Sequence, residues 1–129
     1  MQNVIFSHHV MATNNKVQEL QNRLSKLLGA EAQLKAQRDF KPKDELKGDE
    51  WERLIVDTVE KFDVFVITTL NIGRATTKTA NLMKIKGKKV LFFNGRELLP
   101  VRYIKTVNAN DWRAGWMCIY GDRVPAQVG

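Results

Sequence analysis

The feature that most constrains this chain is a pair of apolar runs separated by a helical stretch. The runs are residues 63–68 (DVFVIT) and 88–93 (KKVLFF), and neither alternates polar with apolar residues. Such runs are typical of strands that helices cover on both faces. Between them lies a helical pattern from about Thr76 to Lys86, which Gly87 ends. A strand, a helix and a strand joined by short loops make a right-handed crossover, which predicts a parallel sheet.

The first half of the chain contains another strand and two amphipathic helices. Residues 4–6 (VIF) predict a short buried strand. Thr13 or Asn14 then caps a helix that Gly29 ends, with apolar residues at helical spacing: Val17, Leu20, Leu24, Leu27 and Leu28. This leucine stripe spans under two heptads, which favours core packing over a short coiled coil. Asp49 is the predicted N-cap of the second helix.

The remaining segments are less distinctive. Residues 31–37 (EAQLKAQ) fit a short strand or a helix, and the segment around Pro42 is a loop. Beyond Pro100, residues 101–107 fit a strand, and a second strand would contain Trp112, Trp116, Met117, Ile119 and Tyr120. We therefore expect an α/β fold: a small parallel-core sheet flanked by helices in three layers. We expect residues 1–99 to form the domain, with a helical insertion at about 36–61, and residues 100–129 to form a C-terminal extension packed on it.

Positive charge is concentrated in one part of the sequence. The chain has a net charge of +7, yet residues 72–105 contain one acid, Glu97, and nine basic residues: Arg74, Lys78, Lys84, Lys86, Lys88, Lys89, Arg96, Arg102 and Lys105. A local excess of this size attracts polyanions. A solvated basic face is the alternative. The residues that we expect to contact a nucleic-acid backbone are Arg74, Lys84, Lys86, Lys88, Lys89, Arg96 and Arg102.

Several classes of protein are disfavoured. No apolar run approaches the roughly 20 residues that cross a bilayer, and no basic region followed by an apolar stretch opens the chain. Cys118 is the single cysteine, so an intramolecular disulfide is excluded. We therefore expect an intracellular protein, in the cytoplasm, nucleoid or nucleus, that does not bind membranes.

Five segments together match a known pattern. They are residues 4–7 (VIFS), 27–30 (LLGA), 62–67 (FDVFVI), 76–80 (TTKTA) and, after Gly87, residues 90–93 (VLFF). In this order the chain resembles the BRCT domain, the small α/β module of DNA repair and replication proteins, over about residues 3–99. The sequence differs from that family in having His8 where a glycine is usual, and in the insertion at 36–61.

The resemblance implies a non-catalytic module whose partner is DNA or a phosphoprotein. It also implies a phosphate site made by Ser7, the backbone N–H of His8, and Lys78, with Thr76 supporting them. Physical reasoning points to the same place without the family. The carboxyl ends of parallel strands lie beside helix N-termini, where free N–H groups and the helix dipole favour anions.

Other interpretations remain open. The segment 71–74 (NIGR) could belong to a Rossmann-like or TIR-like nucleotide-binding protein, although it has one glycine and no phosphate-loop motif. Residues 74–86 lack the carboxylate that a TIR-type NAD hydrolase needs, which counts against catalysis. Trp112, Trp116 and Tyr120, near Arg113 and Arg123, would stack on bases, pack in a core or form a homo-oligomer interface.

Chemistry at the tandem histidines is disfavoured. His8 and His9 are neighbours on an extended segment, so their side chains point to opposite faces and do not readily share a metal. No cluster of carboxylates or cysteines lies near them in the sequence. We expect neither a metal, a cofactor nor an enzymatic activity.

Overall fold

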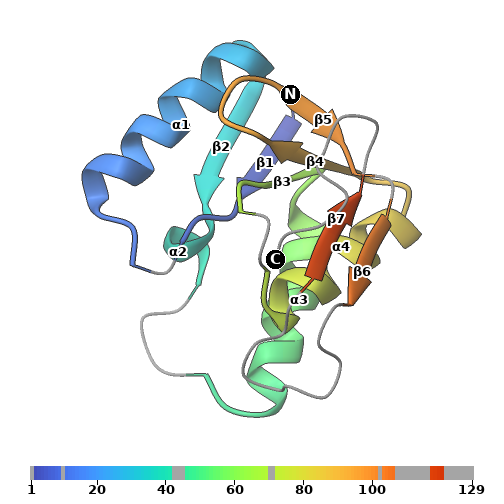
Figure 1. Ribbon diagram of the computed structural model, residues 1–129. Helices are drawn as coiled ribbons and strands as arrows, with labels where there is room; N and C mark the ends of the chain where they lie inside the picture. Colours follow the sequence, from blue (N-terminus) through green and yellow to red (C-terminus); the bar gives the residue numbers. More distant parts are fainter. Residues whose placement is uncertain are drawn as a thin grey trace.

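The computed structural model in Figure 1 describes residues 2–9, 11–41, 46–69, 72–101, 103–106 and 117–120; for Arg74 and for the last two ranges it describes the backbone alone. The elements follow in the order β1 (Gln2–Phe6), α1 (Asn14–Leu28), β2 (Ala32–Ala36), α2 (Gln37–Phe40), α3 (Asp49–Lys61), β3 (Val64–Ile67), α4 (Arg74–Ile85), β4 (Lys89–Phe93), β5 (Leu98–Pro100), β6 (Tyr103–Thr106) and β7 (Met117–Tyr120).

The centre of the fold is a five-stranded sheet in the order β2-β1-β3-β4-β5. Its first four strands are parallel, with Val4 opposite Val64 and Val64 opposite Lys89. The short β5 pairs antiparallel with β4. The prediction of an α/β fold with a parallel core is therefore confirmed. Because β1 leads outward to β2 while β3 leads the other way to β4, the strand order reverses between β1 and β3.

Helices cover the two faces of the sheet unequally, as Figure 1 shows. On one face, α1 packs on a cluster that contains Val4, Phe6, Val17, Leu24, Val64, Val66 and Phe93. On the other, α3 and α4 pack on a cluster that contains Ile5, Ile55, Val59, Phe65, Ile67, Met83 and Phe92. Alternate residues of each strand enter different clusters because successive side chains point to opposite faces. Three layers result, and the predicted insertion, through Ile55 and Val59, supplies part of the core.

The first helix forms as its sequence predicts. The Thr13 side chain accepts a hydrogen bond from the Lys16 amide at 3.2 Å, which satisfies one of the free N–H groups of the first turn. Gly29 ends the helix with φ of 91°, a conformation that glycine adopts without steric cost. Val17 and Leu24 are buried, so the apolar stripe packs in the core, while Leu27 stays exposed.

Three details differ from, or settle, the sequence predictions. Residues 32–36 form a strand, which resolves the ambiguity of that segment. The N-cap of α3 is Gly48, and the predicted cap Asp49 is the first helical residue. Helix α4 begins at Arg74, two residues earlier than predicted, because Gly73 in an extended conformation serves as its cap. As a consequence Lys78 lies in the second turn of α4 rather than in its first.

The sheet continues slightly beyond the predicted domain boundary. Pro100 pairs with Leu91, and the Val101 amide donates to the Val90 carbonyl at 3.0 Å. Strands β6 and β7 then form a separate antiparallel pair, which agrees with the two strands predicted after Pro100. Trp112 and Trp116 lie outside the described residues. Within the described part of the chain, no helix combines the length and apolar character that crossing a membrane requires.

Candidate ligand site at the carboxyl end of the sheet

Ser7 and Thr68 join the ends of β1 and β3, where the strand order reverses. The Thr68 amide donates to the Ser7 Oγ at 3.2 Å, and the Thr68 Oγ1 donates to the Ser7 carbonyl at 2.6 Å. Ser7 is only 3% exposed. Its side-chain oxygen is thus already an acceptor within the fold, and the described residues supply no acceptor for its hydroxyl hydrogen.

The two histidines are held by backbone groups. The Nε2 of His8 accepts from the Arg38 amide at 3.2 Å, while its Nδ1 lies 3.0 Å from the His9 carbonyl. The Nδ1 of His9 accepts from the Met11 amide at 3.1 Å. These bonds fasten the end of β1 to the start of α2 and shape the turn toward α1. No cluster of three or more histidine, cysteine or acidic side chains that could hold a metal occurs among the described residues.

The N-terminus of α4 lies at the same end of the sheet, directly after β3. Its first turn contains no acidic residue, and no side chain of the described residues caps it. The Thr77 hydroxyl donates to the Gly73 carbonyl at 2.8 Å, so it does not compete for the free amides of the first turn. Thr76 is half-buried there. These features are those of a helix end that favours an anion.

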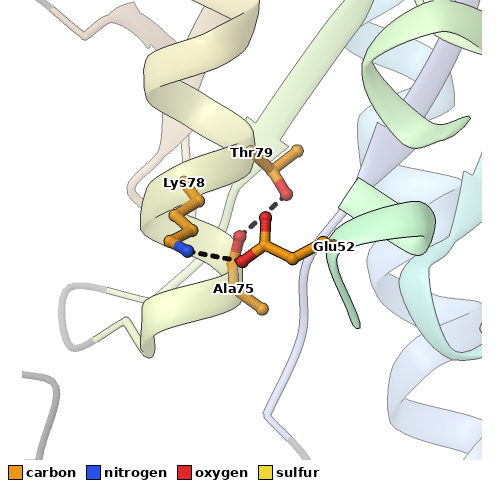
Figure 2. Close-up of polar contacts among 4 residues, drawn as sticks. All are labelled: Glu52, Ala75, Lys78 and Thr79. Atoms are coloured by element: carbon orange, nitrogen blue, oxygen red, sulfur yellow. Dashed lines mark hydrogen bonds and ion pairs between the residues drawn. The ribbon is translucent and has the colours of Figure 1, made fainter. Parts of the chain in front are cut away.

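Lys78 is paired with a carboxylate of the protein itself. Its Nζ lies 2.6 Å from the Oε1 of Glu52, in the first turn of the neighbouring helix α3, as Figure 2 shows. Both side chains are more than half exposed, at 56% and 59%. The Thr79 hydroxyl, drawn beside them, donates to the Ala75 carbonyl at 2.8 Å. A carboxylate of the protein therefore already binds Lys78, and a phosphate would have to compete with Glu52 for its amine.

The basic residues predicted to contact nucleic acid fall into two groups. The amines of Lys84 and Lys88 bind main-chain carbonyls: Lys84 that of Val101, and Lys88 those at the end of α3. Lys86, Lys89 and Arg96 are exposed, the last in the turn between β4 and β5. The side chain of Arg74, and all of Arg102, lie outside what the structure describes. The exposed residues are thus the ones that can contact a partner without giving up a hydrogen bond to a main-chain carbonyl.

A shallow, open hollow of about 430 Å³ lies beyond the ends of β3 and β4. Its lining residues are Leu20, Thr68, Phe92, Phe93, Asn94 and Gly95. The residues come from α1, from the position after β3, and from β4 with its following turn. Crevices at the carboxyl ends of parallel strands are where α/β sheets commonly bind ligands. We call this feature the strand-end hollow.

The sequence analysis did not assign the polar residues of the strand-end hollow to a site. Thr68 directly follows the central strand, and that position was the available signal, because the end of a parallel strand faces the ligand-binding edge. The Asn94-Gly95 pair is typical of a turn and gave no sign of a ligand contact. Comparison of the chain with models of protein families, with curated proteins and with solved structures found no match.

Proposed function

We propose that this chain is a non-catalytic binding module for a phosphate-bearing polyanion, DNA before phosphoprotein. The observation that carries the proposal is the charge of residues 72–105, where nine basic residues accompany the single acid Glu97. This field attracts a polyanion regardless of its sequence. The resemblance to BRCT domains points in the same direction and stays a prediction.

The positions of two exposed cations favour a polymer over a single phosphate group. Lys89 begins β4, and Arg96 follows the end of that strand. The four steps from Lys89 to Phe93, at about 3.3 Å each, place Lys89 and the turn that contains Arg96 at opposite ends of a strand roughly 13 Å long. One phosphorylated side chain does not reach both. A DNA duplex, with one charge per roughly 1.7 Å of its axis, presents phosphates along the whole distance.

A terminal phosphate would add a second, local contact. The uncapped first turn of α4 offers amide donors, and Thr76 stands beside them. Lys78 would contribute its charge once its amine leaves Glu52, and Ser7 its hydroxyl hydrogen. Because the Lys78–Glu52 pair is exposed, the cost of separating it is small, on the order of 1 kcal/mol or less.

The test is a titration of fluorescently labelled duplexes, with and without a 5′-phosphate, across a series of salt concentrations. The logarithm of the binding constant should fall linearly with the logarithm of the salt concentration. The double variant Lys86→Ala/Lys89→Ala should lower this slope by about 2, because each phosphate contact contributes about 0.9. Lys26→Ala/Lys35→Ala, which removes the same charge from exposed positions of α1 and β2, is the matched control.

Other outcomes separate the competing interpretations. An equal decrease of the salt-dependence slope in both double variants would show that only the net charge matters. It would contradict a DNA-binding surface at Lys86 and Lys89. Nucleotide-dependent thermal stabilisation without DNA binding would favour a nucleotide receptor instead. A mass that rises with concentration, with no ligand bound, would favour an oligomeric scaffold.

A further inference from the structure

Part of one sheet face has no helix over it in the described residues. Phe93 and Leu91 project toward the α1 side, and their partners on β5 are Leu98 and Pro100. Leu91 and Leu98 are half-buried and pack against the cluster that α1 covers. Lys89 lies on the same face by strand alternation and is exposed. An apolar strip with a cation at its start therefore leads along β4 to the strand-end hollow.

The walls of the strand-end hollow suit a flat, mostly apolar group. The apolar part of the lining comes from Leu20 and from the 4% of Phe92 and 5% of Phe93 that stay exposed, and no described residue contributes a charged side chain to it. A volume of about 430 Å³ lies in the range of about 300–1,000 Å³ that small-molecule sites occupy. A phosphate or a charged peptide side chain would lose hydration here without gaining an ionic partner.

Two polar groups at its rim offer hydrogen bonds of opposite kind. The Oδ1 of Asn94 accepts from the Arg96 and Glu97 amides, both at 2.9 Å. Its Nδ2 therefore carries two donor hydrogens, for which the described residues supply no acceptor. The Thr68 Oγ1 donates its hydrogen to the Ser7 carbonyl, so its lone pairs are left to accept. A donor and an acceptor thus flank an apolar wall.

We propose that the strand-end hollow binds an unpaired nucleobase. A base is flat, has apolar faces, and carries donors and acceptors together along its edge, which matches the lining. The inference rests on the proposed function and deepens it. The DNA strand that carries the base would run along β4, with its backbone near Arg96 beside the hollow and near Lys89 at the other end of β4. The module would then prefer DNA with an overhang or an open end to a fully paired, blunt duplex.

The first test uses adenosine, an uncharged probe that the basic surface does not attract. In ¹⁵N-labelled protein, adenosine should shift the amide signals of Thr68, Asn94 and Gly95. Asn94→Asp keeps an oxygen for the Arg96 and Glu97 amides but removes both donor hydrogens, so it should weaken adenosine binding about tenfold. Asn81→Asp makes the same chemical change at an exposed position of α4, on the other face, and should leave binding unchanged.

The second test compares duplexes whose single-nucleotide overhang has a base or is abasic. We expect the base to improve affinity about tenfold or more, and Asn94→Asp to erase this difference. Equal affinity for the two duplexes, together with no response to adenosine, would overturn the inference and leave the polyanion proposal intact. Adenosine binding at these residues without any DNA binding would support the hollow as a base site and would contradict the polyanion proposal. Amide shifts that adenosine causes evenly over the whole protein would also contradict binding in the strand-end hollow.

Discussion

Thr68 donates two hydrogen bonds to Ser7 across the point where the strand order reverses. Each bond uses a side-chain oxygen of one residue and a backbone group of the other, at 3.2 and 2.6 Å. The pair thereby ties the loop that leaves toward α1 to the loop that leaves toward α4. These loops lead to helices on opposite faces of the sheet, and such a reversal of strand order is where parallel α/β sheets commonly bind ligands.

Replacement of Ser7 by alanine should therefore destabilise the fold. The variant leaves the half-buried Thr68 amide without an acceptor, and we expect the free energy of unfolding to fall by about 1–2 kcal/mol. Urea denaturation followed by circular dichroism measures it. Ser25→Ala, at an exposed position of α1, is the control and should change stability by less than about 0.5 kcal/mol. Equal stability of the two variants would contradict this role for Ser7.

Lys88 stabilises the end of α3. Its Nζ donates to the carbonyls of Phe62 at 2.9 Å and Glu60 at 3.3 Å, and also to that of Val59. A cation at this end of a helix also opposes the negative end of its dipole. Lys88→Met should lower the free energy of unfolding by about 1–3 kcal/mol, whereas Lys89→Met, at the exposed neighbouring position, should have little effect. Thermal and urea unfolding of both variants check this, and indistinguishable values would count against it.

His8 and His9 should carry their hydrogens on different ring nitrogens when neutral. The Nε2 of His8 is an acceptor, which leaves the hydrogen on Nδ1 to bond the His9 carbonyl. In His9 the Nδ1 is the acceptor, which leaves the hydrogen on Nε2. Long-range ¹H–¹⁵N correlation spectra at neutral to alkaline pH distinguish these tautomers. The same tautomer in both rings would show that the backbone contacts do not control them.

Glu52 should compete with a terminal phosphate for Lys78. Glu52→Gln removes the carboxylate and should increase the preference for a 5′-phosphorylated duplex severalfold, with a stability change below about 1 kcal/mol. Glu50→Gln removes the same charge from the same turn of α3 and is the control, because no ion pair joins Glu50 to Lys78 in the described residues. A Lys78→Ala background should abolish the effect of Glu52→Gln. An equal gain in both glutamine variants would mean that only net charge matters.

The sequence by itself determined the layered α/β fold and the segments that build it. The apolar run before Thr68 predicted a buried strand, and the stripe through Val17 and Leu24 favoured an inward helix face, because the spacing of apolar residues can be read within each segment. Helix starts proved less predictable: Gly48 caps α3 where Asp49 was the expected cap, and α4 begins at Arg74 where a start at about Thr76 was expected. Because α4 begins two residues earlier than expected, Lys78 lies about half a turn further from the helix N-terminus. That difference is enough to change its neighbours.

Only the tertiary structure decided which basic side chains are free of main-chain contacts and can bind a partner. Lys84, Lys86, Lys88 and Lys89 look equivalent in the sequence, yet two of them bind carbonyls and two reach solvent. The difference arises because a helix end from elsewhere in the chain supplies acceptors to one lysine and not to its neighbour. In the same way Leu20, Thr68 and Asn94 are distant in sequence and meet only when the sheet assembles. Sequence pattern reports what a segment buries, whereas a site depends on which segments come together.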